Sequence, residues 1–182
     1  VVLHEVQIGI GRPDLVVLRV DVERLAWRRV AGLRLSGYNE AVVLGALRSG
    51  RLAELGLSRA YARRLERSVV DRGWLDLGVG DRLISDSMVL EAKVSDWRRA
   101  LLQLSQVRWA AQQAALVVPH RLADRIPAIA LTPQGMGVLA VDDLGGINWS
   151  RPAPPRTLPF ELDAWLGELA LRELAEATGS RG

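Results

Sequence analysis

Of the 24 basic residues in this chain, only Lys93 is a lysine. It follows Glu91 by two positions in an apolar run, 88–94, that is typical of a buried strand. Residues i and i+2 of a strand point to the same face, so we expect the acid and the amine to lie side by side. Lysine also carries a compact charge whose pKa burial can tune, which arginine does not. The alternative interpretation is chance combined with a surface ion pair.

The composition excludes several kinds of chemistry. The chain has no cysteine, which excludes disulfides, thiol catalysis and cysteine-ligated zinc. Only His4 and His120 are present, so a multi-histidine metal site or a Ser/His triad has little material. A metal site would have to be rich in oxygen ligands, which favours Mg²⁺ or Mn²⁺.

Charge and hydropathy suggest the setting in which the chain works. The formal net charge is +3, which mildly favours a polyanionic partner. No run of 18 apolar residues and no basic-then-apolar leader is evident, so we expect no membrane association and a cytoplasmic location.

Short apolar runs predict a sheet at both ends of the sequence. A hairpin is expected from 1–10 and 13–20, with Pro13 acceptable at the first position of its strand. A helix is expected over 97–113, begun by Ser95 or Asp96. Further strands are expected at 89–94, 114–118, 137–142 and 147–150, and 126–131 fits either a strand or a turn of helix.

Between these strands, residues 26–82 have a helical pattern. Asn39 is a candidate N-cap for a helix at 40–48. In a second helix, 57–71, the apolar stripe lies opposite three arginines, Arg59, Arg63 and Arg67. Two short strands around a glycine turn, 74–77 and 82–84, would follow. This order resembles a winged helix-turn-helix, which implies that the arginine stripe contacts DNA; the alternative is a solvated helix face.

Outside that insert, the chain resembles the PD-(D/E)XK nuclease superfamily. Pro13-Asp14 is similar to the first motif, and Glu91-Ala92-Lys93 to the second. The helix from Trp97 and the strand at 137–142 are also similar to those of family members. The resemblance implies an α/β fold, a restriction-endonuclease-like mixed sheet flanked by helices, interrupted by the winged-helix-like insert.

The resemblance implies roles for particular residues. Asp14 and Glu91 would be ligands of Mg²⁺ or Mn²⁺, the backbone carbonyl of Ala92 would add a third oxygen, and Lys93 would be catalytic. Glu5 could add a carboxylate near the metal or be a solvated strand residue. A hard cation polarises the phosphate and lowers the pKa of a bound water, and a lysine beside it can orient or deprotonate that water.

The helix after the second motif matches the family in part. Gln103 stands where several subfamilies carry a glutamine that contacts the metal-bound water or the substrate. The aromatic residue expected four positions later is Val107 here. We also expect Arg98, at the start of the same helix, to contact DNA.

The predicted organisation is a nuclease-like core at 1–25 and 83–150, the insert at 26–82, and a proline-rich linker with a terminal helix at 151–182. The leading hypothesis is a metal-dependent DNA nuclease, an endonuclease. One alternative is a catalytically weak or inactive DNA-binding or regulatory protein on the same scaffold. Another is an interaction domain whose terminal helix, from Phe160, makes a partner or homodimer contact.

Overall fold

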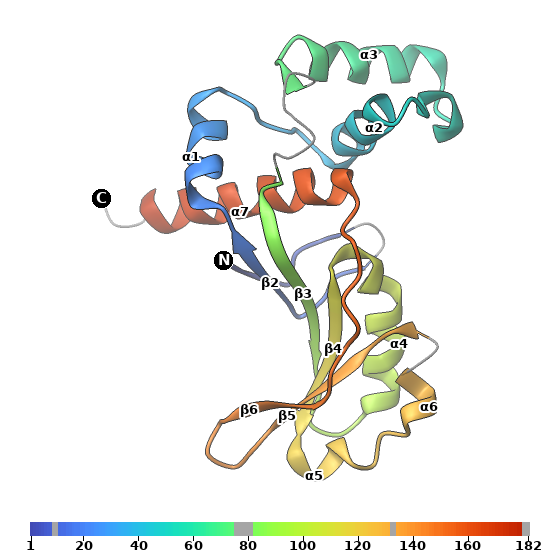
Figure 1. The fold of residues 1–182 in the computed structure, drawn as a ribbon, viewed down its shortest axis with the longest axis vertical. Coiled ribbons are helices and arrows are strands. Elements are labelled where there is room, and N and C mark those ends of the chain that lie inside the picture. Colours follow the sequence, from blue (N-terminus) through green and yellow to red (C-terminus); the bar gives the residue numbers. More distant parts are fainter. Residues whose placement is uncertain (9–10, 75–81, 132–133, 180–182) are drawn as a thin grey trace. The chain divides into compact units, whose positions relative to one another are not determined.

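The structure is a computed structural model that describes residues 1–8, 11–74, 82–131 and 134–179 (Figure 1). Its elements, in chain order, are β1 (Val2–His4), β2 (Leu15–Val20), α1 (Val22–Val30), α2 (Tyr38–Arg48), η1 (Leu52–Leu55), α3 (Arg59–Val70), β3 (Ile84–Ala92), α4 (Trp97–Val107), η3 (Arg108–Ala110), β4 (Gln113–Pro119), α5 (His120–Ala123), α6 (Ala128–Leu131), β5 (Gly137–Val141), β6 (Ile147–Arg151) and α7 (Phe160–Gly179). The predicted mixture of helices and strands is confirmed.

Six strands form one sheet in the order β1-β2-β3-β4-β5-β6. The β1–β2 and β5–β6 pairs are antiparallel, while β3–β4 and β4–β5 are parallel. Parallel neighbours need a long crossover, which α4 supplies between β3 and β4. The protein is therefore an α/β chain with a mixed sheet, as the sequence predicted.

The chain divides into two compact units. The first contains Val1, 19–85 and 159–182, and the second contains 2–18 and 86–158. The terminal helix α7 belongs to the first unit, together with the helices of the predicted insert, rather than with the proline-rich residues that precede it.

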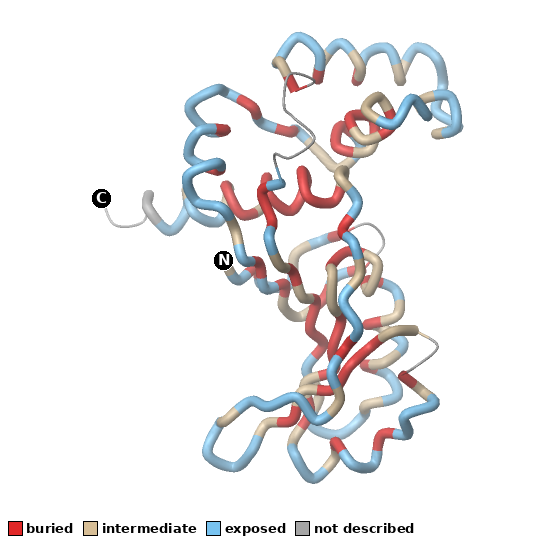
Figure 2. The backbone as a smooth tube through the Cα atoms, in the orientation of Figure 1, coloured by how far each residue is buried: buried red, intermediate tan, exposed pale blue. Residues whose placement is uncertain are grey.

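The second unit is built around β4. Its run Ala114-Ala115-Leu116 is buried, which is typical of a central parallel strand covered on both faces. Helix α4 contacts β4 and buries Ala100, Leu104 and Val107 along one stripe. Full burial of a leucine side chain contributes about 1.5–3 kcal/mol. Figure 2 shows the buried residues gathered along the middle strands of the sheet.

Helix α4 is shorter than predicted. It begins as expected at Trp97, where the Asp96 side chain accepts a hydrogen bond from the Arg99 amide. It ends at Val107 rather than at Gln113. The cause is a tertiary contact. The backbone amide of Gln112 donates to the Ser87 hydroxyl of β3 at 2.9 Å, and β4 begins at the next residue.

The first unit packs α2 against both α3 and α7. Its core is a cluster of buried residues from these helices, from the segment after α1 and from the residues after α3, namely Leu33, Leu35, Ala41, Leu44, Val69, Trp74, Ala164 and Trp165. Figure 2 shows the first part of α7 as buried, and residues 162–168 are buried without a break. Among the described residues, no helix is both long and apolar enough to cross a lipid bilayer.

A buried ion network fixes α7 to α1 and to the segment that follows α1. Glu168 is fully buried and pairs with Arg28 at 2.6 Å, and Arg28 is only 1% exposed. The Glu168 carboxylate also accepts hydrogen bonds from Arg34 and from the Leu35 amide. Arg28 stacks over the Trp74 ring at 4.4 Å, so the network is continuous with the apolar core.

Three local predictions need correction or lie outside the described residues. The first strand covers only Val2–His4, because Glu5 has φ 47° and leaves the extended conformation. Asn39 is not an N-cap: α2 starts at Tyr38, and the side-chain Nδ2 of Asn39 donates to the Tyr61 hydroxyl. Most of the predicted wing, 75–81, lies outside the described residues.

The buried network gives a stability prediction. Replacing Glu168 by glutamine leaves the Arg28 guanidinium buried without its counter-charge, which we expect to lower the free energy of unfolding by about 3–5 kcal/mol. The matched control is Glu173→Gln, an exposed position on the same helix, which should change it by less than about 0.5 kcal/mol. Urea denaturation followed by circular dichroism measures both, and equal effects would contradict the assignment.

Candidate functional site

The structure brings Asp14, Glu91 and Lys93 together in the second unit. Asp14 directly precedes β2, Glu91 is the last residue but one of β3, and Lys93 follows β3. The Lys93 Nζ lies 3.1 Å from Glu91 Oε1 and 3.5 Å from Asp14 Oδ2. Both carboxylates therefore meet at one ammonium. We call these three residues the carboxylate–lysine cluster.

Backbone hydrogen bonds position the cluster. The Lys93 amide donates to the Val117 carbonyl of β4 at 3.0 Å. Neighbouring residues of a strand direct their backbone groups to opposite edges, so Ala92 faces the β2 side. There its amide donates to Asp14 Oδ2 at 2.8 Å. Because the N–H and C=O of one strand residue point to the same edge, the Ala92 carbonyl is directed to the β2 side as well.

The end of β3 has a physical cause in β4. In a parallel ladder the amide two positions after Val117 would donate to the Lys93 carbonyl. That residue is Pro119, which has no backbone N–H. The β3–β4 pairing accordingly ends at Ala92 and Val117. Lys93 thus stands at the point where the strand is released from the sheet.

The two carboxylates of the cluster differ in how far they are buried. Glu91 is 1% exposed, whereas the side chain of Asp14 is 36% exposed. Burial raises the pKa of Glu91 above its ordinary value; the Lys93 ammonium opposes that rise and the nearby Asp14 charge adds to it. The cluster combines one desolvated acid with one that solvent can reach.

Lys93 is held in its charged form. Its side chain is 30% exposed. Desolvation alone would lower the pKa of Lys93, but the carboxylates of Glu91 and Asp14 outweigh it and raise this pKa above its ordinary value. A protonated lysine can stabilise negative charge that develops on a bound group, but it cannot act as a base in this state.

Glu5 is not part of the cluster. Its carboxylate forms an exposed ion pair with Arg12 at 3.1 Å, and Arg12 also donates to the Glu5 carbonyl. Only the backbone of Glu5 reaches the site, because its amide donates to the Asp14 carbonyl. Among the described residues, no group of three or more His, Asp or Glu side chains is arranged to hold a metal.

Gln103 lies in the middle of α4. Its Oε1 is buried and accepts no hydrogen bond from any described residue. Four positions on, Val107 is 1% exposed and packs against Gly11, where an added Cβ would lie 2.0 Å from Val107 Cγ1. That contact leaves no room for the aromatic side chain of the family pattern.

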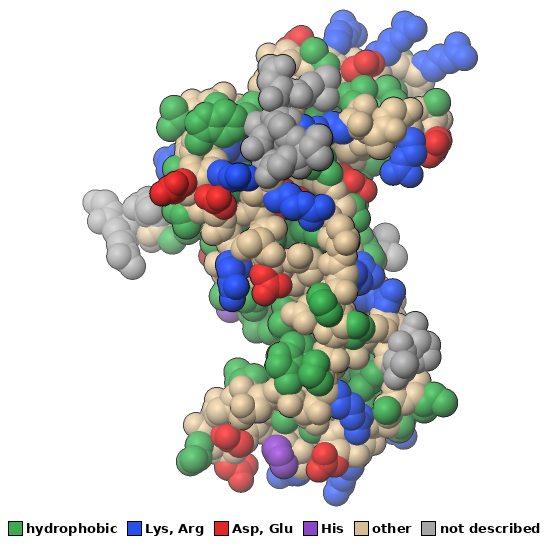
Figure 3. Space-filling view, viewed as in Figure 1, with side chains coloured by type: hydrophobic (Ala, Val, Ile, Leu, Met, Phe, Trp, Pro, Cys, Tyr) green, Lys and Arg blue, Asp and Glu red, His purple; other side chains and the backbone are tan. Residues whose placement is uncertain are grey.

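The predicted DNA-contacting arginines are exposed. In the first unit, Arg59, Arg63 and Arg67 lie along α3, opposite the buried Leu65 and Val69. Within the described residues none of these three arginines forms an ion pair, and Figure 3 shows basic side chains gathered over α3.

In the second unit, Arg98 at the start of α4 is also exposed. Its guanidinium stacks over the Trp97 ring at 4.7 Å. This contact holds the charge at the surface of the helix.

Sequence reasoning missed two features. One is the Ala92 amide as a donor to Asp14, since a side-chain-to-backbone bond between distant segments leaves no local signal. The other is a basic pocket that includes Arg48 and Arg51. Its signal was the run Arg48-Ser49-Gly50-Arg51, two arginines that flank a helix end.

Comparisons with known proteins give little further information. No protein-family model and no curated protein matches the chain. One solved structure, a protein of unknown function from Silicibacter pomeroyi, matches with a TM-score of 0.41 and 19% identity over 53% of this chain. The match spans 63% of that protein's chain. A TM-score of this size does not establish a shared fold, so the chemistry of the site is inferred from its geometry.

The raised pKa of Glu91 gives a pH prediction for the metal-free protein. Between pH values equal to the ordinary glutamate pKa of about 4.3 and to the raised pKa of Glu91, the folded state binds more protons than the unfolded chain. The free energy of unfolding therefore falls as pH rises through this range. Glu91→Gln cannot titrate. We therefore expect the free energy of unfolding of the wild type, relative to this variant, to fall through that range in EDTA.

The control is Glu54→Gln, which removes an exposed carboxylate and should leave the pH dependence of the wild type intact. Urea denaturation at a series of pH values measures all three proteins. A wild-type-to-Glu91→Gln difference that is constant or grows with pH would show that the Glu91 pKa is not raised.

Proposed function

We propose that this protein is a metal-dependent DNA nuclease, an endonuclease of the PD-(D/E)XK superfamily with a restriction-endonuclease-like core. The observation that carries the proposal is the convergence of Asp14 and Glu91 on the Lys93 ammonium. The three residues occur in the order of the family motifs and come from the ends of β2 and β3. The proposal is further supported by the burial of Glu91 and by its raised pKa, since perturbed acids cluster at functional sites.

The donor set suits Mg²⁺ or Mn²⁺. These ions prefer oxygen ligands, and Mg²⁺ is commonly held by one or two carboxylates while it keeps several waters. Asp14 and Glu91 would hold the ion, with the Ala92 carbonyl as a further oxygen on the same edge. When bound, the ion would supply Lewis-acid polarisation of a phosphoryl oxygen and a water of lowered pKa.

The remaining work falls to residues of the chain. The Lys93 ammonium would neutralise charge that develops on the phosphodiester in the transition state. The Ala92 amide would keep the Asp14 carboxylate in place through its hydrogen bond. Gln103, whose buried Oε1 has no partner among the described residues, is proposed to contact substrate or a bound water. We do not include Glu5 in this role, because its carboxylate is paired with Arg12.

The insert is proposed to bind duplex DNA through α3. Three exposed arginines on one helix face can contact phosphates or guanine edges, as recognition helices of winged helix-turn-helix domains do. Arg98 is proposed as a further phosphate contact in the core. We also propose a cytoplasmic location. The net charge of +3 is consistent with a protein that acts on DNA, a polyanion.

A second candidate is a DNA-binding or regulatory protein without catalysis. Two observations favour it. Val107 fills the place of the family's aromatic residue, and Lys93 closes both carboxylates into an internal ion cluster. Such a cluster can also be purely structural, because charges that are paired with one another need no ligand.

Cleavage assays separate the two candidates. We expect plasmid DNA to be cut only when Mg²⁺ or Mn²⁺ is added, and Lys93→Ala to lower the rate by about 10²–10³-fold through loss of transition-state charge stabilisation. Lys93→Arg should be impaired as well, because a guanidinium keeps the charge but not the compact geometry.

The matched control for this assay is Arg125→Ala, which removes an exposed positive charge and should retain activity. Thermal denaturation of each variant checks that it folds. The nuclease proposal fails if no metal-dependent cleavage occurs, or if folded Lys93→Ala cuts DNA as fast as the wild type.

Charge reversal on α3 tests the DNA-binding proposal. Changing Arg59, Arg63 and Arg67 together to glutamate should weaken duplex binding and reduce the slope of log K against log salt by about 0.9 for each lost phosphate contact. Fluorescence anisotropy at several salt concentrations measures both quantities.

A control with the same change in net charge shows whether the position of the arginines matters. Reversal of three exposed arginines elsewhere, Arg19, Arg121 and Arg125, should have a smaller effect on affinity and on slope. If the two triple variants change affinity and slope equally, the arginines of α3 contribute only to the net charge and α3 is not a specific DNA-binding surface.

A further inference from the structure

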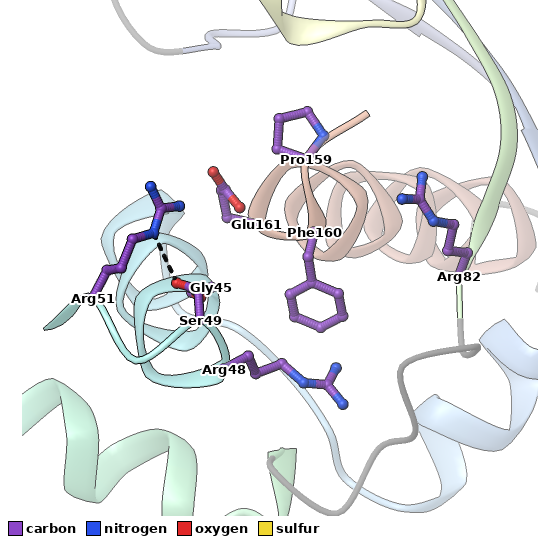
Figure 4. Close-up of a pocket in the computed structure, with 8 residues that line it drawn as sticks. All are labelled: Gly45, Arg48, Ser49, Arg51, Arg82, Pro159, Phe160 and Glu161. Carbon is purple, nitrogen blue, oxygen red and sulfur yellow. Dashed lines mark hydrogen bonds between the residues drawn. The ribbon is translucent and has the colours of Figure 1, made fainter. Parts of the chain in front are cut away.

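A basic pocket lies within the first unit, and none of its lining residues belongs to the carboxylate–lysine cluster. Its volume is about 440 Å³. Figure 4 shows it at the start of α7, where the C-terminal end of α2 and the loop that follows α2 contribute side chains. The lining residues are Gly45, Arg48, Ser49, Arg51, Arg82, Pro159, Phe160 and Glu161.

The pocket carries an excess of positive charge. Three guanidinium groups, of Arg48, Arg51 and Arg82, line it, together with one carboxylate, that of Glu161. No ion pair joins Arg48 or Arg51 to that carboxylate within the described residues; Arg51 instead reaches Glu54, at 3.9 Å. A site with this charge is suited to an anion.

Arg48 is the most informative of these residues. Its guanidinium lies over the Phe160 ring at 4.3 Å, which fixes its position in the pocket. Its NH1 atom is buried and donates to no described residue. A buried donor of a charged group without an acceptor is costly, so it indicates an acceptor that a ligand would bring.

Arg51 and the start of α7 add further donors. The Arg51 Nε donates to the Ser49 hydroxyl at 3.3 Å, as Figure 4 shows, which leaves its terminal nitrogens toward solvent and the weak Glu54 contact. Phe160 and Glu161 are the first residues of a 20-residue helix. The first amides of a helix have no intrahelical acceptor, and the helix dipole favours negative charge beside them.

We propose that this pocket binds a phosphate group, either free phosphate or the phosphate of a nucleotide chain. Guanidinium forks match the paired oxygens of a phosphate, and more than one fork is available here. The aromatic and proline surfaces of Phe160 and Pro159 would contact the less polar part of a phosphate ester.

Glu161 opposes the bound anion. It approaches α2 closely because residue 45 is glycine: a Cβ there would lie 2.8 Å from Glu161 Oε2. Its carboxylate balances part of the arginine charge when no phosphate is bound. Neutralising Glu161 should therefore tighten phosphate binding, which a purely structural role of the arginines does not predict.

Isothermal titration of the full chain with inorganic phosphate tests the proposal. We expect saturable binding in the millimolar range or tighter, weakened about tenfold or more by Arg48→Gln and by Arg51→Gln, because each removes a charge-assisted hydrogen bond. Glu161→Gln should strengthen it. Arg29→Gln, an exposed arginine of α1 in the same unit, is the matched control and should bind as the wild type does.

Two oligonucleotides of one sequence, with a 5′-phosphate and with a 5′-hydroxyl, identify the source of the phosphate. Only the part of their binding that is lost in Arg51→Gln is assigned to the pocket. Preference for a 5′-phosphorylated over a 5′-hydroxyl strand assigns the pocket to a terminal phosphate, and equal binding assigns it to the backbone. Binding of inorganic phosphate alone assigns it to the free ion.

The proposal is overturned if none of these ligands binds, or if folded Arg48→Gln and Arg51→Gln bind all of them as the wild type does. Because Lys93 takes no part in these measurements, loss of the nuclease proposal would leave this result unchanged.

Discussion

A carboxylate taken out of water needs partners, and the way in which this chain supplies them separates its structural acids from its candidate functional one. Glu168 accepts hydrogen bonds from arginines and a backbone amide. Asp163 accepts them from the backbone amides of Ile84, the first residue of β3, and of Leu83, which precedes it. Glu40 binds an amide, a hydroxyl and an arginine. Glu91 is as deeply buried, but its partners, the Lys93 ammonium and the Asp14 backbone, belong to the candidate site itself. A group so placed can exchange the partly exposed Lys93 for another cation, whereas the other three hold helices and strands together.

The cluster depends on strand geometry more than on side-chain packing. The alternation of β3 puts Glu91 and Lys93 on one face, and the loss of the ladder at Pro119 releases the chain after Ala92. The amide freed toward β2 then binds Asp14. Two segments far apart in the sequence thus bring their acidic side chains together at one edge of the sheet, without any loop that must fold around a ligand.

The sequence predicted those features that local periodicity encodes. Strands β4 and β5 were found because their apolar runs are short and uninterrupted, and helix α7 because its leucines recur at helical spacing. The end of α4 was missed because a β3 hydroxyl captures the Gln112 amide, a contact between segments that no local window contains. Glu5 was grouped with the site through the family resemblance, but its left-handed φ takes it out of the strand, and its carboxylate pairs with Arg12. The pairing of Glu91 with Lys93 needed only a two-residue period, and so it could be read from the sequence.

The solitary lysine is explained by the limits of arginine at this position. A guanidinium is permanently charged and presents a planar fork that suits one carboxylate in a bidentate pair. The ammonium of Lys93 contacts two carboxylates from different strands at 3.1 and 3.5 Å, a geometry that suits a compact point charge. The arginines elsewhere serve extended contacts, such as the stack of Arg28 on Trp74 and that of Arg48 on Phe160. Among the described residues, the chain thus uses the planar cation for stacking and for pairing with single carboxylates, and the compact cation where Glu91 and Asp14 share one charge.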